Sequence, residues 1–291
     1  LPPMIIMSAI KENTIMIIGG PNAGKTHFGG QLFGRLNART EHFKMTSQPE
    51  DLTIFKEVWD QLNEGKSAGH TSVNMHKTLE MHIEDNDGKK SVFTFPDYGG
   101  EQIKSMVNDR RINKTWKEQI EKSNSWLLFV RLDEIVPVED VANRGIPEQK
   151  ILDLRGTDEQ PMVLSGIAFY TELLQMLLFA KQVSTKIPIN SPKLSVVISC
   201  WDLLTKKEQK ELPKDVLSKK LPGFYNFLQT TWASEHLQVI GLSSTEKSLS
   251  NDNPDMDFIK KGPENFGYII SDSGEKFKDL TLTIASFIGN K

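Results

Sequence analysis

The chain alternates between short apolar runs and longer segments in which apolar residues recur every three or four positions. Four apolar runs have the length and composition of buried strands: 13–19, 125–133, 193–202 and 236–244. Helical periodicity is found in the segments between and after them: 25–36, 49–65, 101–121, 166–180, 206–233 and 273–289. Within 206–233, Pro213 and Pro222 predict one helix or two. This alternation predicts an α/β fold with a mostly parallel sheet and helices on both faces.

A hairpin interrupts the alternation. Residues 76–85 alternate like a strand, Asn86-Asp87-Gly88 favours a turn, and 89–97 returns as a second strand. We therefore expect a mixed sheet with one antiparallel hairpin strand, and 236–244 as the last core strand. We expect a single domain spanning 1–291, with insertions near 133–160, which is acidic and lacks clear periodicity, and near 245–265, which is polar.

A glycine-rich stretch follows the first predicted strand. Gly19-x-x-x-x-Gly24-Lys25-Thr26 fits the pattern of a phosphate-binding loop, and it stands between a predicted strand and a predicted helix. Glycines let successive N–H groups face phosphate oxygens, the lysine places a cation on the β- and γ-phosphates, and the threonine hydroxyl ligates Mg²⁺. The alternative is an ordinary strand-to-helix turn. We expect nucleotide contacts from Gly19, Pro21, Asn22, Ala23, Gly24, Lys25, Thr26 and His27.

A second motif ends the hairpin. Asp97 closes an apolar strand and Gly100 follows three residues later, as Asp-x-x-Gly. This spacing lets the carboxylate reach Mg²⁺ through water while the glycine N–H reaches the γ-phosphate. A strand-ending Asp in a glycine turn is the alternative.

A third element is suited to selecting a base. Asp202 lies just past a predicted buried strand, where a carboxylate can accept hydrogen bonds from guanine N1 and N2, which adenine does not offer. The alternative is a helix N-cap. Ser243 and Ser244 follow the next strand, and their backbone can meet the guanine O6.

Composition excludes some classes of partner and covalent structure. The chain has 291 residues and a net charge of -3, so no overall positive charge favours nucleic acid. It has one cysteine, Cys200, so no disulfide forms within the chain. The first residues lack a signal-peptide pattern, and 166–180 contains Glu172 and Gln175 and is short for a bilayer span. We expect a cytoplasmic protein without a membrane span or a nucleic-acid partner.

The order of these motifs resembles the Ras-like, translation-factor class of P-loop GTPases. Segment 58–72 and the Asp-x-x-Gly-Glu form are also similar to bacterial double-GTPase proteins of conflict (anti-phage) gene clusters. The resemblance implies GTP/GDP and Mg²⁺ as cofactors, and Thr71, or else Ser72, as a catalytic switch residue that ligates the metal. It implies a role in bacterial defence and a protein partner: an effector or activator, a second copy of the chain, or another GTPase.

The sequence departs from that family in two places. The usual Asn-Lys-x-Asp is here Ser199-Cys200-Trp201-Asp202, so the lysine that packs over the base is missing, and Trp201 either covers the base or packs into the core. Glu101 replaces the glutamine that orients water. We therefore expect a GTP-binding switch that hydrolyses GTP slowly, with Lys25, Gly100 and Glu101 at the reaction centre.

Two other functions remain as alternatives. The first is a nucleotide-dependent scaffold or adaptor with little or no hydrolysis. The second is a P-loop kinase or ATPase, which is disfavoured because a kinase needs an arginine-rich lid. The 133–160 insertion is acidic and contains only two arginines, Arg144 and Arg155.

Overall fold

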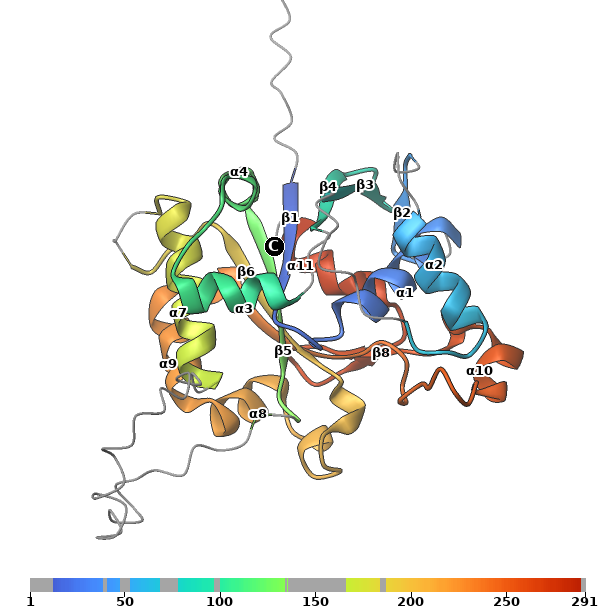
Figure 1. Ribbon diagram of the computed structural model, residues 1–291. Coiled ribbons are helices and arrows are strands. Elements are labelled where there is room, and N and C mark those ends of the chain that lie inside the picture. The colour runs from blue at the N-terminus through green and yellow to red at the C-terminus, as the bar shows by residue number, and fades with distance from the viewer. Residues whose placement is uncertain are drawn as a thin grey trace, which may run out of the picture.

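The computed structural model describes residues 13–38, 41–47, 53–68, 78–96, 100–133, 135, 166–183 and 187–288. These ranges form a nine-stranded sheet in the order β2-β3-β4-β1-β5-β6-β7-β8-β9, with helices on both faces (Figure 1). Three residues predicted for the site lie outside the described residues: Thr71, Ser72 and Asp97. Most of the 133–160 insertion lies outside them as well.

Five parallel strands form the centre of the sheet. They are β4 (Lys90–Pro96), β1 (Asn13–Gly19), β5 (Ser125–Arg131), β6 (Lys193–Ser199) and β7 (Leu237–Ser243). Four are the predicted apolar runs, and β4 is the second strand of the predicted hairpin. Parallel strands place their carboxyl ends at one edge, where ligands bind in open α/β sheets. The loops that carry the predicted site residues after β1, β6 and β7 therefore begin at the same edge.

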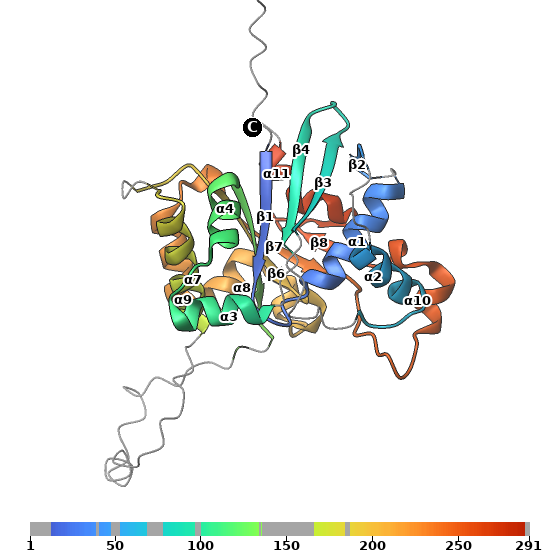
Figure 2. The same ribbon diagram turned by 45° about the horizontal axis from the view of Figure 1, so that its top comes forward.

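Antiparallel strands flank this centre on both sides. β3 (Thr78–Asp85) pairs with β4 in the predicted hairpin, which Figure 2 shows beside β2 (Phe43–Met45). On the other side β8 (Tyr268–Ile270) and β9 (Lys276–Phe277) extend the sheet beyond β7. The predicted mostly parallel mixed sheet with an antiparallel hairpin is therefore confirmed, β2, β8 and β9 are additional antiparallel strands, and the expectation of 236–244 as the last core strand is wrong. Strands of two or three residues are too short to show an alternating pattern.

Three predicted helices agree closely with the structure, and one predicted helix differs. The agreeing helices are α1 (Lys25–Ala38), α2 (Thr53–Asn63) and α7 (Gly166–Ala180). The single helix predicted over 101–121 is two helices, α3 (Gly100–Asp109) and α4 (Lys114–Lys122). Arg110 adopts a φ of 51° and Asn113 caps α4 by accepting from the Trp116 N–H, so the chain turns between them.

In the C-terminal third, the two prolines in 206–233 begin separate helices, α8 (Pro213–Lys220) and α9 (Pro222–Thr231), because proline suits the first helical turn. This confirms the two-helix alternative, whereas two other predictions in this part of the chain are wrong. The predicted polar loop at 245–265 contains α10 (Met256–Lys261), which buries Phe258. The helix predicted over 273–289 is instead β9, a 3₁₀ turn (Leu280–Ile284) and α11 (Ala285–Ile288).

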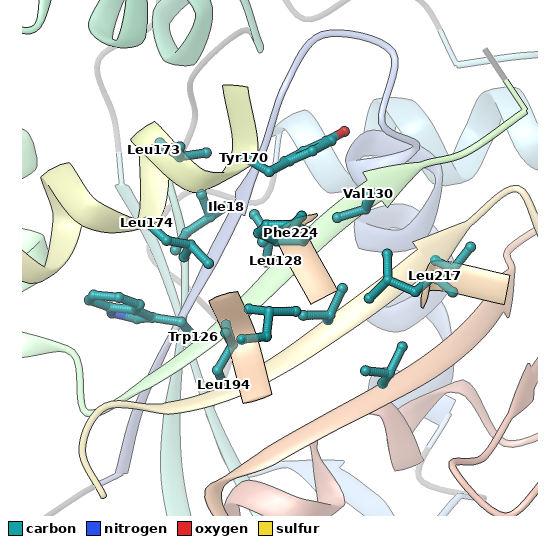
Figure 3. Packing of buried hydrophobic residues seen from close by; sticks show 14 of the residues in the cluster. Ile18, Trp126, Leu128, Val130, Tyr170, Leu173, Leu174, Leu194, Leu217 and Phe224 are labelled. Carbon is teal, nitrogen blue, oxygen red and sulfur yellow. The ribbon is translucent and has the colours of Figure 1, made fainter. Parts of the chain in front are cut away.

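The core has two apolar layers, one on each face of the sheet. Along β1, Met16 and Ile18 face the layer covered by α3, α4, α7, α8 and α9, while Ile15 and Ile17 face the layer covered by α1 and α11. Figure 3 shows the first layer, where side chains of β1, β5 and β6 meet those of α7, α8 and α9. Helix α7 buries only one side, since Phe179 is 86% exposed. Among the described helices, none combines the length and apolarity of a membrane span.

Glycines in α1 allow α2 to pack closely against it. A Cβ on Gly30 would collide with Val58, and a Cβ on Gly34 would collide with the ring of Trp59. Glycine weakens a helix by about 1 kcal/mol relative to alanine, so these glycines lower the intrinsic stability of α1. The structure shows that the close approach of α2 requires it.

Replacing Gly34 tests this packing. Gly34→Ala is expected to lower the free energy of unfolding by about 1–3 kcal/mol, because overpacking against Trp59 exceeds the gain in helix propensity. Urea unfolding measures the loss. Adding Trp59→Leu should recover part of it in a double-mutant cycle. Equal stability of Gly34→Ala and the wild type would show that α2 shifts without cost.

Candidate functional site

A cavity of about 620 Å³ lies at the carboxyl edge of the parallel strands. Its walls come from the loop after β1, the start of α1, residues 67–68, the start of α3, the end of β5, and the loops after β6 and β7. Segments far apart in the sequence therefore meet at the edge where the sequence motifs were expected to converge.

The loop after β1 closes around the side chain of Lys25. The Lys25 Nζ donates to the carbonyl oxygens of Gly19 and Gly20, at 2.7 Å each, and the residue is 9% exposed. Asn22 and Gly24 have φ values of 56° and 78°, a left-handed conformation that lets the loop turn this tightly. Burial lowers the pKa of Lys25 to about 7. The Lys25 side chain thus lies at the cavity wall, which Pro21, Ala23 and Thr26 also line.

The start of α3 touches this loop. A Cβ on Gly100 would collide with Pro21 and with the carbonyl carbon of Gly20, so only glycine allows the backbones to approach this closely. Glu101 follows in the first turn of α3, exposed and at the cavity wall. The structure therefore brings together the phosphate-loop motif and the glycine of Asp-x-x-Gly, which are about 80 positions apart in the sequence.

The predicted metal ligands are only partly described. Thr26 lines the cavity, whereas Asp97 and Thr71 lie outside the described residues. In the part of the chain that the structure describes, no three or more His, Cys, Asp or Glu side chains cluster as a metal site. A Mg²⁺ site needs no such cluster, because Mg²⁺ keeps several waters and takes one or two protein ligands beside the phosphates.

His27 connects α1 to the segment that leads toward Thr71. Its Nε2 accepts a hydrogen bond from the Ala68 N–H at 3.1 Å and lies 3.3 Å from the Ser67 Oγ. Burial lowers the pKa of His27 to about 4, so the ring is neutral at pH 7 and Nε2 can accept. The side chain therefore contacts the cavity wall at 67–68, a contact that the sequence did not predict.

A sharp turn after β6 presents Asp202 to the cavity. Cys200 is left-handed, with φ 52° and ψ 41°, and a 3₁₀ turn follows over Trp201–Leu203. Trp201 is buried against β7, where a Cβ on Gly241 would lie 2.6 Å from its ring, so Trp201 is part of the core. Thr205, rather than Asp202, caps the next turn through reciprocal hydrogen bonds with Glu208.

The two serines after β7 differ in position. Ser243 is fully buried, and its Oγ accepts from the Glu246 N–H at 2.9 Å, while Ser244 lines the cavity. Sequence reasoning did not identify Lys247, which also lines the cavity and bonds to Asp255 at 2.9 Å.

Arg131 is the second residue that sequence reasoning missed. It is the last residue of β5 and lines the cavity, and its Nη1 donates to the carbonyl oxygen of Asn22 at 3.2 Å. The available signal was a charged residue at the carboxyl end of an otherwise apolar central strand, the edge where ligands bind.

The strand, the glycine-rich loop around a buried lysine, and the helix that begins at that lysine define a phosphate-loop nucleotide-binding protein. The chain belongs to the Double-GTPase 1 family, whose model matches residues 16–287. The family confirms the resemblance to double-GTPase proteins and indicates a GTP-binding protein. No curated protein matches the chain.

Several solved structures of GTPases are similar to the chain, at low sequence identity and low TM-score. They include a bacterial selenocysteine-specific elongation factor, EF-Sec, at 13% identity and a TM-score of 0.37, covering 80% of this chain and 26% of that one. The GTP-bound Ski7 GTPase-like domain of S. cerevisiae is 13% identical with a TM-score of 0.35, and the match covers 80% of this chain and 42% of that one. The SRb-GTP/SRX complex of the signal recognition particle receptor from Chaetomium thermophilum is 13% identical with a TM-score of 0.36, and the match covers 82% of this chain and 93% of that one. The chain spans about a quarter of the EF-Sec chain and under half of the Ski7 chain.

Removing the charge of Lys25 should separate binding from folding. In Lys25→Met, we expect GTP affinity to fall about 10- to 150-fold, the value of a charge-assisted hydrogen bond. The nucleotide-free fold should be at least as stable at pH 7. The folded-state pKa of about 7 lies below the unfolded 10.5, so the cost of burying the charge is complete below pH 7 and fades toward pH 10.5.

Calorimetric titration with GTP and thermal unfolding without nucleotide measure the two effects. Lys44→Met, on the edge strand β2 where Lys44 is partly exposed, is the matched control and should change neither. Unchanged GTP affinity in Lys25→Met would refute the phosphate-loop assignment.

Proposed function

We propose that the protein is a GTP-dependent switch that binds GTP with Mg²⁺, hydrolyses it slowly and controls a partner protein. The observation that carries the proposal is one cavity lined by two chemically different sets of residues. Lys25 and Gly100 line it from the start of α1 and the start of α3, and Asp202 and Ser244 line it from the loops after β6 and β7. In this proposal the first set forms the phosphate end, which suits a triphosphate, and the second forms the base end, which suits the edge of a guanine base.

At the phosphate end, the chain supplies charge and directed N–H groups. Lys25 is already held at the loop by two carbonyls, so it contacts the β- and γ-phosphates without a large rearrangement. The N-terminus of α1 adds the positive end of the helix dipole. Thr26 would hold Mg²⁺ through its hydroxyl, with Asp97 through water and Thr71 or Ser72 as the switch ligand. When bound, that ion neutralises charge on the phosphate oxygens.

At the base end, specificity comes from hydrogen bonds at the purine edge. The Asp202 carboxylate would accept from guanine N1 and N2, and the backbone near Ser244 would donate to O6. Adenine has an acceptor at N1, no amino group at C2 and a donor in place of O6, so it does not match these partners. The short Ser244 side chain leaves room for the base, whereas the buried Ser243 shapes the turn through its bond to Glu246.

Glu101 is the reason to expect slow hydrolysis. Glu101 follows Gly100, which touches the phosphate loop, and it lines the same cavity. In the proposed complex its carboxylate therefore faces the γ-phosphate. At ~6 Å with an effective dielectric of ~20, two like unit charges repel by roughly 3 kcal/mol. Such repulsion, if kept in the transition state, costs about a hundredfold in rate. A residue supplied by a partner would then accelerate the reaction.

The same contact supports a switch. Because Gly100 begins α3 against the loop, a change at the γ-phosphate is transmitted directly to the start of that helix. A partner that contacts α3 would therefore distinguish GTP from GDP. The partner is a protein effector or activator, a second copy of the chain, or another GTPase. The resemblance to conflict-system proteins extends the proposal to bacterial defence in the cytoplasm.

A nucleotide-dependent scaffold is the second candidate, and Glu101 is the observation that favours it. If the carboxylate blocks attack by water and no partner relieves it, the protein binds GTP and orders its switch segments without measurable turnover. Both candidates require the same binding site and differ only in hydrolysis.

The base assignment is tested by Asp202→Asn. The amide should weaken GTP binding by at least tenfold, since it loses a charge-assisted hydrogen bond, and should favour xanthosine triphosphate, whose extra carbonyl an amide N–H can satisfy. Competition titrations with GTP, xanthosine triphosphate and ATP measure the preference. Asp109→Asn at the end of α3 is the matched control. A wild-type protein that binds ATP as tightly as GTP would contradict guanine selection.

The role of Glu101 is tested by single-turnover GTP hydrolysis in the wild type and Glu101→Gln. We expect slow release of phosphate by the wild type and faster release by the variant, by up to about a hundredfold, because the like-charge repulsion is removed. Glu118→Gln on the exposed face of α4 is the control and should change nothing. Brisk hydrolysis by the wild type that slows in Glu101→Gln would show that the carboxylate positions the water.

A further inference from the structure

We infer that Arg131 forms the platform on which the purine base stacks, and that it connects the base end of the cavity to the phosphate loop. The inference rests on the proposed GTP-binding function and adds a base-contacting residue to it. An aspartate at the edge of a base selects its hydrogen-bonding pattern but leaves the flat faces of the base without a partner. Base stacking on flat or cationic side chains supplies much of the affinity in nucleic-acid sites.

The position of Arg131 in the sheet places it beside the turn after β6 that carries Asp202. Strands β5 and β6 are parallel neighbours, and Arg131 pairs in register with Ser199, the last residue of β6. Cys200 and Asp202 follow directly and line the same cavity as Arg131. The side chain of Cys200 is short, so a long flat cation from the adjacent strand can cover what the cysteine does not.

The guanidinium of Arg131 is held in a fixed orientation. Its Nε donates to Asp133 Oδ1 at 3.0 Å and its Nη2 donates to Asp133 Oδ2 at 3.0 Å, while Nη1 donates to the Asn22 carbonyl at 3.2 Å. These hydrogen bonds lie along the edges of the group. A guanidinium hydrogen-bonds in its plane and stacks through its faces, so this anchoring is compatible with stacking on a base. The side chain is 23% exposed.

The ion pair argues against a role on the phosphates. Asp133, itself 16% exposed, neutralises the guanidinium at close range, which leaves little net charge to attract an anionic group. Stacking depends on the flat polarisable surface and survives such pairing. Arg131 is therefore better suited to the neutral base than to the triphosphate.

The bond to Asn22 adds a mechanical consequence. Asn22 is in the phosphate loop and has a φ of 56°, and its carbonyl accepts from Arg131. A base that stacks on Arg131 would hold the guanidinium in place and so stabilise its hydrogen bond to Asn22. Binding of the base would then make the phosphate loop more ordered.

The experiment compares GDP and GTP affinities of the wild type, Arg131→Ala and Arg131→Ala combined with Cys200→Lys by calorimetry. Loss of the stacking surface should weaken GDP and GTP equally, by about tenfold to a hundredfold. The ratio of GDP to ADP affinity should stay unchanged, because Asp202 reads the edge. Cys200→Lys should recover part of the lost affinity by placing an alkyl chain and a cation beside the base from the neighbouring strand.

Each other outcome is informative. Wild-type affinity in Arg131→Ala would overturn the inference, and so would a loss confined to GTP, which would assign Arg131 to the γ-phosphate. Arg131→Met with Asp133→Asn removes the ion pair without leaving a lone carboxylate, and it gives the same comparison if Arg131→Ala unfolds. A wild type that binds no guanine nucleotide would instead refute the proposed function.

Discussion

The site depends on one buried cation and the two carbonyls that hold it. The Lys25 ammonium closes the loop after β1 onto Gly19 and Gly20. Burial of that charge is unfavourable, as the lowered pKa shows, and two neutral carbonyls compensate it only in part. In the proposed function, this arrangement awaits the anionic phosphates. The surrounding structure keeps the arrangement because the central strands that lead into the loop are buried.

The parallel sheet converts this local arrangement into a complete cavity. Strand ends at one edge bring three distant loops together, and close backbone contacts make the assembly tight. Gly100 is in contact with the phosphate loop, and Gly241 leaves space for Trp201 in the turn that carries Asp202. Arg131, at the end of β5, donates a hydrogen bond to Asn22. The two ends of the cavity are thus connected by backbone contacts and hydrogen bonds as well as by the ligand that would occupy it.

The sequence predicted the features that arise from local chemistry. The phosphate loop, the five parallel strands, the hairpin and most helices follow from short patterns with one physical meaning. Features set by tertiary contacts escaped prediction: β2, β8 and β9 are too short to carry a pattern. Nothing local distinguishes the buried Ser243 from the cavity-lining Ser244, and Arg131 gains its partners only when β5 lies beside β1 and β6. The roles predicted for Lys25, Thr71, Asp97, Glu101 and Asp202 stay predictions.

The outermost strands have a consequence for assembly. Within the described residues, the sheet ends in β2, of three residues, on one side and in β9, of two residues, on the other. Such short ends present few unpaired backbone groups in line, so another chain gains little by adding a strand to either of them. Neither end is therefore a ready template for edge-to-edge aggregation. Recognition of this molecule by other proteins would accordingly rely on the shape and charge of its helices and loops.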